Sequence, residues 1–74
     1  MKENMNEKIT QLLRSTIESN GIKYTYISKQ TKIDYQRLMR IFNQNAIISG
    51  SELICLCKTL KIEQSKLMEL IADT

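Results

Sequence analysis

The stretch over residues 24–43, YTYISKQTKIDYQRLMRIFN, restricts the fold of this chain more than any other part of it. Its apolar residues recur at helical spacing on both sides of a short polar break, which indicates two helices joined by a sharp turn. We expect the first helix over residues 25–31, with Ile27 facing inward, and the turn over residues 32–34. Asp34 suits the start of the second helix, because its carboxylate can accept a backbone N–H at the positive end of the helix dipole.

The second helix of this pair should run over residues 35–42 and present two different faces. Leu38 and Ile41 lie at helical spacing from Ile33 in the turn, so we expect them to be buried. Phe42 should lie beside them. The other side chains should point largely away from the core: Tyr35, Gln36, Arg37, Met39, Arg40 and Asn43. Most of these carry hydrogen-bonding groups that a packed core does not accommodate, so the face favours a polar partner.

The composition favours one all-helical domain. A chain of 74 residues can build one small core. It has no proline, two glycines and four aromatic residues, which is too few turn formers and strand formers for a β-barrel or sandwich. No apolar run approaches the roughly 20 residues that span a bilayer. The N-terminal sequence MKENMNEK lacks the apolar region of a secretory signal. We therefore expect a cytoplasmic protein with no membrane partner.

Three further helices should complete a single domain over residues 1–74. After a frayed segment at residues 1–5, the first helix is expected over residues 6–19 and ends at Asn20-Gly21, where glycine tolerates the left-handed conformation. Its apolar stripe consists of Ile9, Leu12, Leu13 and Ile17. Ile22 should then pack back on the bundle.

The second half of the chain contains a clear signal for a helix start. Ser49 and Glu52 form an S-x-x-E capping box, which predicts a helix over residues 50–60 that buries Leu53, Leu56, Cys57 and Leu60. A loop over residues 44–48 precedes it, and of Ile47 and Ile48 we expect one docked and one exposed. Ile62 should fill the core before a last helix over residues 64–71, whose apolar residues are Leu67, Leu70 and Ile71. The chain is thus expected to be a compact five-helix bundle.

The positive charge of the chain is concentrated in its middle. Residues 1–22 and 46–74 carry net charges of 0 and −1, whereas residues 23–45 carry five Lys and Arg against Asp34 alone, a net charge of +4. Such a basic segment suits a nucleic-acid partner. A solvated basic face without a partner is the alternative, and charge alone does not separate the two.

Nothing in the sequence favours an enzyme, a cofactor or a metal site. There is no histidine, no glycine-rich phosphate loop and no pair of carboxylates that suggests a pocket. Cys55 and Cys57 lie two positions apart, so on a helix they diverge and cannot hold one metal ion or form an unstrained disulfide. We expect one buried and one partly exposed thiol. A membrane-surface peptide is also disfavoured, because the basic residues alternate with core positions.

Several short motifs follow one another in a characteristic order. Ile27-Ser28 resembles an apolar-plus-small pair, residues 31–34 resemble a T-G-V-S turn, and residues 53–62 resemble an L-x-x-[LI]-A-x-x-L-G-[VI] run. Leu67 matches the anchor of a final helix. Over about residues 9–71 the chain therefore resembles the lambda-repressor-like (XRE-type) helix-turn-helix domains of phage repressors, Cro proteins and related bacterial regulators.

The chain departs from that family's pattern at a few positions. Lys32 and Lys61 stand where the family has glycine in a left-handed conformation, and each should cost about 1 kcal/mol. Ser28 replaces the usual alanine of the first motif helix. Tyr24 stands where a glutamine often helps to orient base contacts, and a tyrosine cannot copy a bidentate amide contact.

The resemblance implies a sequence-specific regulator that reads the major groove of double-stranded DNA with its second motif helix. It transfers base reading to Tyr35, Gln36, Arg37 and Arg40. A glutamine can read adenine, an arginine can read guanine, and a tyrosine can pack on a thymine methyl group. Phosphate contacts, which fix the register, are expected from Lys23, Tyr24, Thr25, Lys29, Lys32 and Asn43. For some of these residues packing is the alternative, and Asn43 can instead cap the helix.

A homodimer is expected on DNA, because one domain this small makes too few contacts for tight specific binding. Its candidate surfaces are the loop at Ile47 and Ile48 and the last helix. Repression is the simplest action, since occupying a promoter is sufficient. The alternative is a protein-interaction module with the same fold, such as an antitoxin or antirepressor, with Tyr35, Met39 and Ile48 as its surface.

Overall fold

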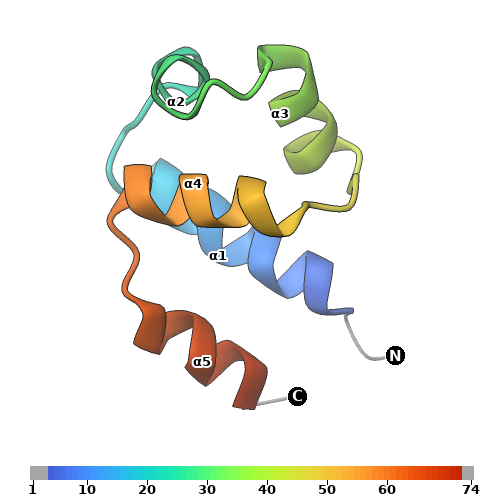
Figure 1. The fold of residues 1–74 in the computed structure, drawn as a ribbon, viewed down its shortest axis with the longest axis vertical. Helices are drawn as coiled ribbons and strands as arrows, with labels where there is room; N and C mark the ends of the chain where they lie inside the picture. Colours follow the sequence, from blue (N-terminus) through green and yellow to red (C-terminus); the bar gives the residue numbers. More distant parts are fainter. Residues whose placement is uncertain (1–3, 73–74) are drawn as a thin grey trace.

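A computed structural model describes residues 4–72 of the chain, except for the side chain of Ile71. Within this range the chain folds into five helices and no strand, as the sequence predicts (Figure 1): α1 (Met5–Ser19), α2 (Tyr24–Thr31), α3 (Tyr35–Asn43), α4 (Gly50–Leu60) and α5 (Gln64–Ala72). None of these helices is long and apolar enough to cross a bilayer. The helix bounds match the predicted ones to within a residue at each end. Residues 1–3 of the segment expected to fray lie outside the described residues.

Side-chain caps explain where three of the helices begin. The Asn4 side chain accepts a hydrogen bond from the Glu7 backbone N–H at 2.8 Å, so α1 starts one residue earlier than expected. The predicted cap at Asp34 is confirmed, because its carboxylate accepts from the Gln36 N–H at 3.0 Å. The capping box of α4 is confirmed in both directions, with 3.2 Å from the Glu52 N–H to the Ser49 hydroxyl and 2.9 Å from the Ser49 N–H to the Glu52 carboxylate.

Left-handed backbone conformations end three helices. Gly21 follows α1 with φ of 62°, as expected from its sequence context. Lys32 after α2 and Lys61 after α4 have φ of 61° and 58°, so both lysines occupy the strained conformation predicted for them. A fourth residue in this conformation, Asn45 in the loop before α4 with φ of 55°, was not predicted. Asparagine tolerates this region better than most residues, which suits it to the loop.

The core is a single apolar cluster drawn from the first four helices. Its buried members are Leu13, Ile17, Ile27, Leu38, Ile41, Phe42, Leu56 and Leu60. The expected burial of Leu53 and Cys57 is only partial, and both pack against the edge of this cluster. Ile48 packs against the cluster while Ile47 is 78% exposed, which confirms that one of these two residues docks.

The helices divide the molecule into two ends (Figure 1). α2 and α3 form the upper end, where α2 is seen nearly end-on and α3 runs down the page, so the two axes cross steeply. α1 and α4 lie across the middle and pack on each other. α5 forms the lower end and, within the described residues, packs against α1 alone. The apolar middle therefore holds the α2–α3 pair out at one end of the molecule.

Candidate functional site

The turn between α2 and α3 is fixed by side-chain hydrogen bonds to its backbone. The Ser28 hydroxyl donates to the Ile33 carbonyl at 2.6 Å. The Thr31 hydroxyl donates to the Ile27 carbonyl at 2.7 Å and accepts from the Ile33 N–H at 3.2 Å. Ser28 therefore has a use that alanine would not provide, because its hydroxyl bridges from α2 to the turn that leads into α3. The direction of α3 is set by these bonds together with burial of Ile27.

The outer face of α3 carries polar side chains, as predicted. Gln36, Arg40 and Asn43 are exposed, and Tyr35 is 44% exposed. Met39 was expected to point away from the core, but it is partly buried and packs against the core cluster. On the opposite side of the helix Leu38 is fully buried. α3 therefore presents a polar strip of donors and acceptors along its length, anchored from beneath by apolar packing.

Arg37 was expected to read a base from that strip, but its guanidinium is bonded within the molecule. Its guanidinium donates from Nε and Nη2 to the two oxygens of Glu52, each at 2.8 Å. Nη2 also donates to the Ile47 carbonyl at 2.7 Å. A bidentate pair of this kind occupies Nε and Nη2, two of the planar donors with which an arginine can recognise guanine. Arg37 thus joins α3 to the start of α4.

The pKa values of this pair reflect that contact. The hydrogen bonds from Arg37 hold the pKa of the Glu52 carboxyl at about 2, well below its usual value, and the bond from Ser49 acts in the same direction. The hydrogen bond to Glu52 raises the pKa of Arg37. Both groups are therefore charged at neutral pH, and the ion pair is present under ordinary conditions.

The loop between α3 and α4 is held from two sides. Arg37 binds the Ile47 carbonyl, as described above. From α1, the Asn6 side chain donates to the Ala46 carbonyl at 3.3 Å and accepts from the Ile48 N–H at 2.9 Å. Sequence reasoning missed Asn6, because its partners are about 40 residues away along the chain. The only signal was a polar residue at the start of an amphipathic helix, which does not identify a distant partner.

The residues expected to contact phosphate gather at the α2–α3 end, with two qualifications. Lys23, Thr25, Lys29 and Lys32 are exposed. The Tyr24 ring is partly buried and lies against Phe42, with ring centroids 5.4 Å apart and planes tilted by 55°. The Asn43 amide is exposed and contacts the Met39 sulfur at 3.5 Å. Tyr24 thus contributes to packing through its contact with Phe42, whereas the lysines are exposed.

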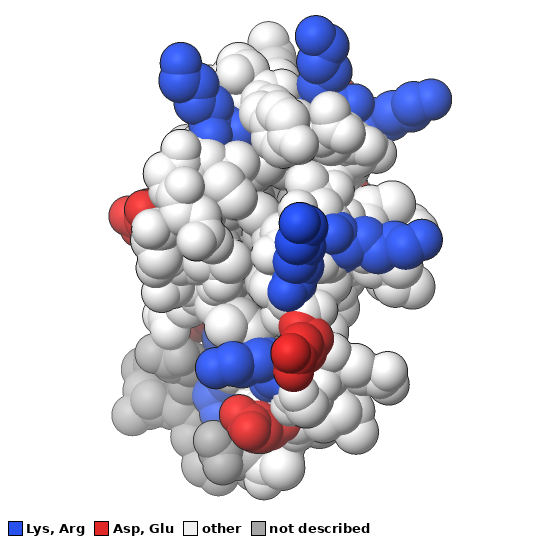
Figure 2. All heavy atoms as spheres, turned by 90° about the vertical axis from the view of Figure 1, so that its left-hand side faces the viewer, with Lys and Arg blue, Asp and Glu red and all other residues white. Residues whose placement is uncertain are grey.

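Basic side chains dominate this end of the surface. Figure 2 shows Lys and Arg side chains projecting from the top of the molecule, where Figure 1 places α2 and α3, while the acidic side chains that show clearly lie lower. Arg40 and the three lysines of residues 23–32 are the exposed cations of this region, and Asp34 is its exposed acid. We call this face the α2–α3 surface, defined by these six groups: Lys23, Lys29, Lys32, Tyr35, Gln36 and Arg40. It can attract and orient a polyanion.

The cysteines show no arrangement that would hold a metal. Cys55 and Cys57 are free thiols, both partly buried, in place of the one buried and one partly exposed thiol that we expected. Burial raises the pKa of the Cys57 thiol, which makes it less reactive. Within residues 4–72 no three potential metal ligands lie together.

Comparison with known proteins finds no relative of this chain. No family model, no curated protein and no solved structure matches the chain. The function is therefore inferred from the residues of the chain and from their arrangement.

Proposed function

We propose that this chain is a sequence-specific DNA-binding regulator of transcription that acts in the cytoplasm and places α3 in the major groove of double-stranded DNA. One observation carries the proposal: Gln36 and Arg40 are exposed on a helix that is anchored by buried Leu38, and the neighbouring helix α2 and its caps carry three exposed lysines. The wide major groove of B-DNA admits an α-helix and offers patterns of donors and acceptors to such side chains. The α2–turn–α3 unit, with its steeply crossed helices, suits the helix-turn-helix manner of binding.

The roles of the α3 residues follow from their chemistry and surroundings. Gln36 lies in the first turn of the helix and can pair with adenine N6 and N7, and Arg40 can pair with guanine O6 and N7. Tyr35 can pack on a thymine methyl group or reach a phosphate. Arg37 is assigned no base contact, because its Nε and Nη2 donors are held by Glu52 and Ile47. Its role is to fix the position of α3 relative to α4.

Phosphate contacts are assigned to α2 and the turn. Lys23, Lys29 and Lys32 are exposed cations there, and Thr25 lies in the first turn of α2 with an exposed side chain. No side chain caps the N-terminus of α2, so its first backbone N–H groups are suited to a phosphate oxygen. Such contacts set the register of the protein on the duplex, while α3 reads the bases.

We further propose that two copies act together on DNA and that the result is repression. Two-fold dimers place recognition helices about 34 Å apart, one turn of the double helix. Occupation of a promoter by such a pair blocks transcription without any other activity. The rival surface for a protein-interaction module, made of Tyr35, Met39 and Ile48, is less favoured because Met39 and Ile48 are partly buried against the core.

Selection of bound sequences from a random pool of duplex DNA tests this proposal. We expect an enriched motif, with inverted half-sites if two copies bind. Arg40→Ala should lose preference at one base pair by roughly 5- to 150-fold, since a good bidentate pair contributes about 1–3 kcal/mol of discrimination. Gln36→Ala should do the same at a neighbouring position.

Lys66→Ala is the matched control for these variants, because Lys66 is an exposed cation on α5. It should keep the motif, and all three variants should keep the helical circular dichroism spectrum. A pool with no enriched motif, or a motif unchanged by both α3 substitutions, would refute the proposal.

A further inference from the structure

Glu52 presents its carboxylate to α3 in the geometry that a DNA phosphate would offer. Arginine binds carboxylates and phosphates through the same pair of parallel N–H donors. The guanidinium of Arg37 forms such a pair with Glu52, from Nε to one oxygen and from Nη2 to the other, each at 2.8 Å. A phosphate that used these two donors of Arg37 would therefore have to displace a bound carboxylate.

The carboxylate of Glu52 is itself held in position. It accepts from the Ser49 N–H at 2.9 Å, and the Glu52 N–H donates to the Ser49 hydroxyl at 3.2 Å. Both bonds belong to the capping box of α4, where the helix dipole also favours a negative charge. The Ile47 carbonyl accepts a further bond from Nη2 of Arg37 at 2.7 Å. Arg37 is thus bound by acceptors that the fold has already placed.

Arg37 lies close to the face of α3 that the proposed function turns toward DNA. It is one position after exposed Gln36 and three before exposed Arg40, and residues three apart are neighbours on a helix surface. Its side chain is 33% exposed, whereas that of Glu52 is 17% exposed. The guanidinium is therefore at the edge of the polar strip, where a polyanion could contact it if Glu52 did not hold it.

The pairing is selective among the cations of this end. No second ion pair forms within residues 4–72. The exposed cations of α2, α3 and the turn between them are Lys23, Lys29, Lys32 and Arg40. One cation is thus neutralised by an internal acid, while four others stay available to phosphates.

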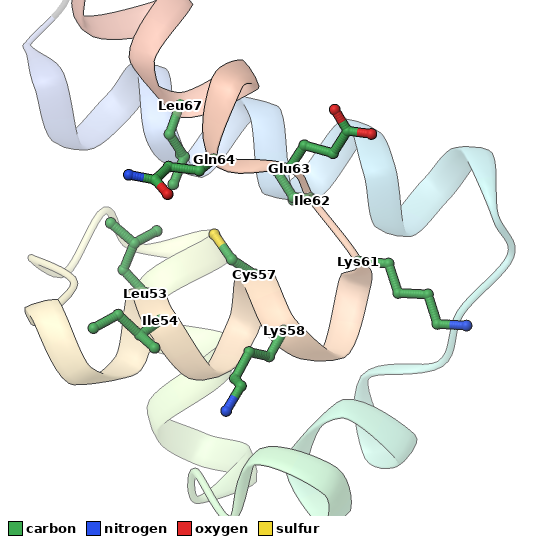
Figure 3. Close-up of a pocket in the computed structure, with 9 residues that line it drawn as sticks. All are labelled: Leu53, Ile54, Cys57, Lys58, Lys61, Ile62, Glu63, Gln64 and Leu67. Carbon is green, nitrogen blue, oxygen red and sulfur yellow. The ribbon is translucent and has the colours of Figure 1, made fainter.

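The side of α4 that faces α5 takes no part in this pairing. Within the described residues α5 packs on α1 and not on α4, which leaves an apolar groove of ≈ 630 Å³ between α4 and α5. Leu53 and Cys57 point into it from α4, and Leu67 points into it from α5 (Figure 3). Glu52 is not among the residues that line the groove, so a substitution there changes the α3 side of α4 and leaves the lining of the groove intact.

We infer that Glu52 determines specificity by withholding Arg37 from DNA phosphates, which limits binding to DNA of any sequence. The inference rests on the proposed function and adds to it a positioning residue that acts through Arg37 and touches no DNA. Phosphate contacts supply essentially all of the affinity for random sequences but only a share of the affinity for a selected site. Base contacts also fix the register at a selected site, whereas a released Arg37 can use any register on random DNA. Its release should therefore favour random DNA.

Anisotropy titrations of the full chain with a random-sequence duplex, from about 50 to 300 mM KCl, test the inference. Glu52→Gln keeps an acceptor for the Ser49 N–H but removes the charge that holds Arg37. The slope of the logarithm of the association constant against the logarithm of the salt concentration should be steeper than the native slope by about 0.9 per domain. The preference of this variant for a selected duplex over the random one should fall.

Three further variants separate release of Arg37 from other effects of the substitution. The double variant Arg37→Gln/Glu52→Gln keeps the native net charge of +3 and should return to the native slope. Arg37→Gln alone should also keep the native slope, because a withheld side chain contacts no phosphate. Glu69→Gln is the matched control, since it removes the same charge from an exposed position on α5 and should not change the slope. Circular dichroism checks that each variant is folded.

Three results would each overturn the inference: a Glu52→Gln slope no steeper than the native one, a double variant as steep as Glu52→Gln, or an unchanged preference for the selected duplex. If Glu52→Gln did not fold, Arg37→Gln alone would decide, because a shallower slope would show that the native Arg37 already contacts phosphate. A chain that enriches a motif but shows none of these slope changes would defeat this inference and leave the proposed function standing. The slope changes without any enriched motif would refute the proposed function and retain the withholding of Arg37.

Discussion

The position of Arg37 on α3 allows two roles, a contact to a DNA base or an ion pair within the molecule. Periodicity places it on the outward side of α3, next to Gln36, so its position alone does not distinguish a base contact from an internal one. The deciding partner is Glu52, whose carboxylate accepts from Arg37 and from the Ser49 N–H. Glu52 therefore caps α4 and binds α3 at the same time, and it couples the proposed reading helix to the rest of the molecule.

Removing the charge of Glu52 should lower stability in a pH-dependent way. The carboxyl has a pKa of about 2 in the folded chain against an ordinary value of 4.5, so its contribution is present above about pH 4.5 and is lost as the pH falls toward 2. Glu52→Gln keeps the size and the acceptor for Ser49 but loses the ion pair. We expect a loss of about 1 kcal/mol at pH 7.

Urea unfolding followed by circular dichroism between pH 7 and pH 2 checks this expectation. The native chain and the Glu52→Gln variant should differ at neutral pH and converge at the acid end. Glu69→Gln, which changes an exposed carboxylate on α5, should follow the native curve. A constant difference between native and Glu52→Gln chains at all pH values would show that the ion pair contributes nothing.

At the scale of elements, local signals in the sequence predicted most of the fold. Capping residues, glycine and apolar spacing are read within four or so residues, which is the range over which helices form their own contacts. The five helices and the cap at Ser49 were predictable for that reason. The links that hold the loop at residues 44–49 were not, because Asn6 and Arg37 reach it from 10 or more residues away.

The candidate site was predictable to the same degree. Exposure of Gln36 and Arg40 follows from the period of α3 and from the buried Leu38. The partial burial of Met39 and Tyr24 depends on how α3 packs against its neighbours, which no local pattern specifies. The groove between α4 and α5 likewise depends on the spacing of the two helices. The apolar residues of those helices follow the pattern that is typical of ordinary core packing, so the sequence does not predict the groove.

The two lysines that end α2 and α4 allow stability and binding to be separated. Lys32 and Lys61 both have left-handed backbone conformations, so replacing either by glycine should relieve strain and stabilise the fold by about 1 kcal/mol. Only Lys32 belongs to the α2–α3 surface. We expect Lys32→Gly to weaken binding to a selected DNA duplex and Lys61→Gly to leave it unchanged.

Thermal unfolding and fluorescence anisotropy of labelled DNA measure the two effects. Both variants should melt at higher temperature than the native chain. Equal DNA affinity in both variants would remove Lys32 from the proposed interface, and a fall in melting temperature would show that the positive φ angles carry no cost.

At the scale of the whole molecule, the net positive charge is concentrated at one end of the longest axis, which measures 32 Å, while the rest of the surface carries both signs. The basic groups of residues 23–40 lie at the end formed by α2 and α3, and the pairing of Arg37 with Glu52 removes one cation from what a partner meets. A polyanion would therefore approach one end of the molecule and leave the α5 end free. This polarity makes the salt dependence of binding a direct test of the proposed orientation.

The logarithm of the association constant for a DNA duplex should fall linearly with the logarithm of the salt concentration, because bound lysines release counterions from the phosphates. The slope is about −0.9 for each phosphate neutralised. If each of three lysines neutralises one phosphate, the slope is about −3 for one domain and roughly −5 for two. These lysines are Lys23, Lys29 and Lys32. Lys29→Ala should reduce the slope by about 1 per domain, while Lys66→Ala on α5 should not change it. Anisotropy titrations between 50 and 300 mM KCl measure these slopes. A slope near zero would indicate that the partner is not a polyanion, and equal effects of both substitutions would show that binding does not use the α2–α3 end.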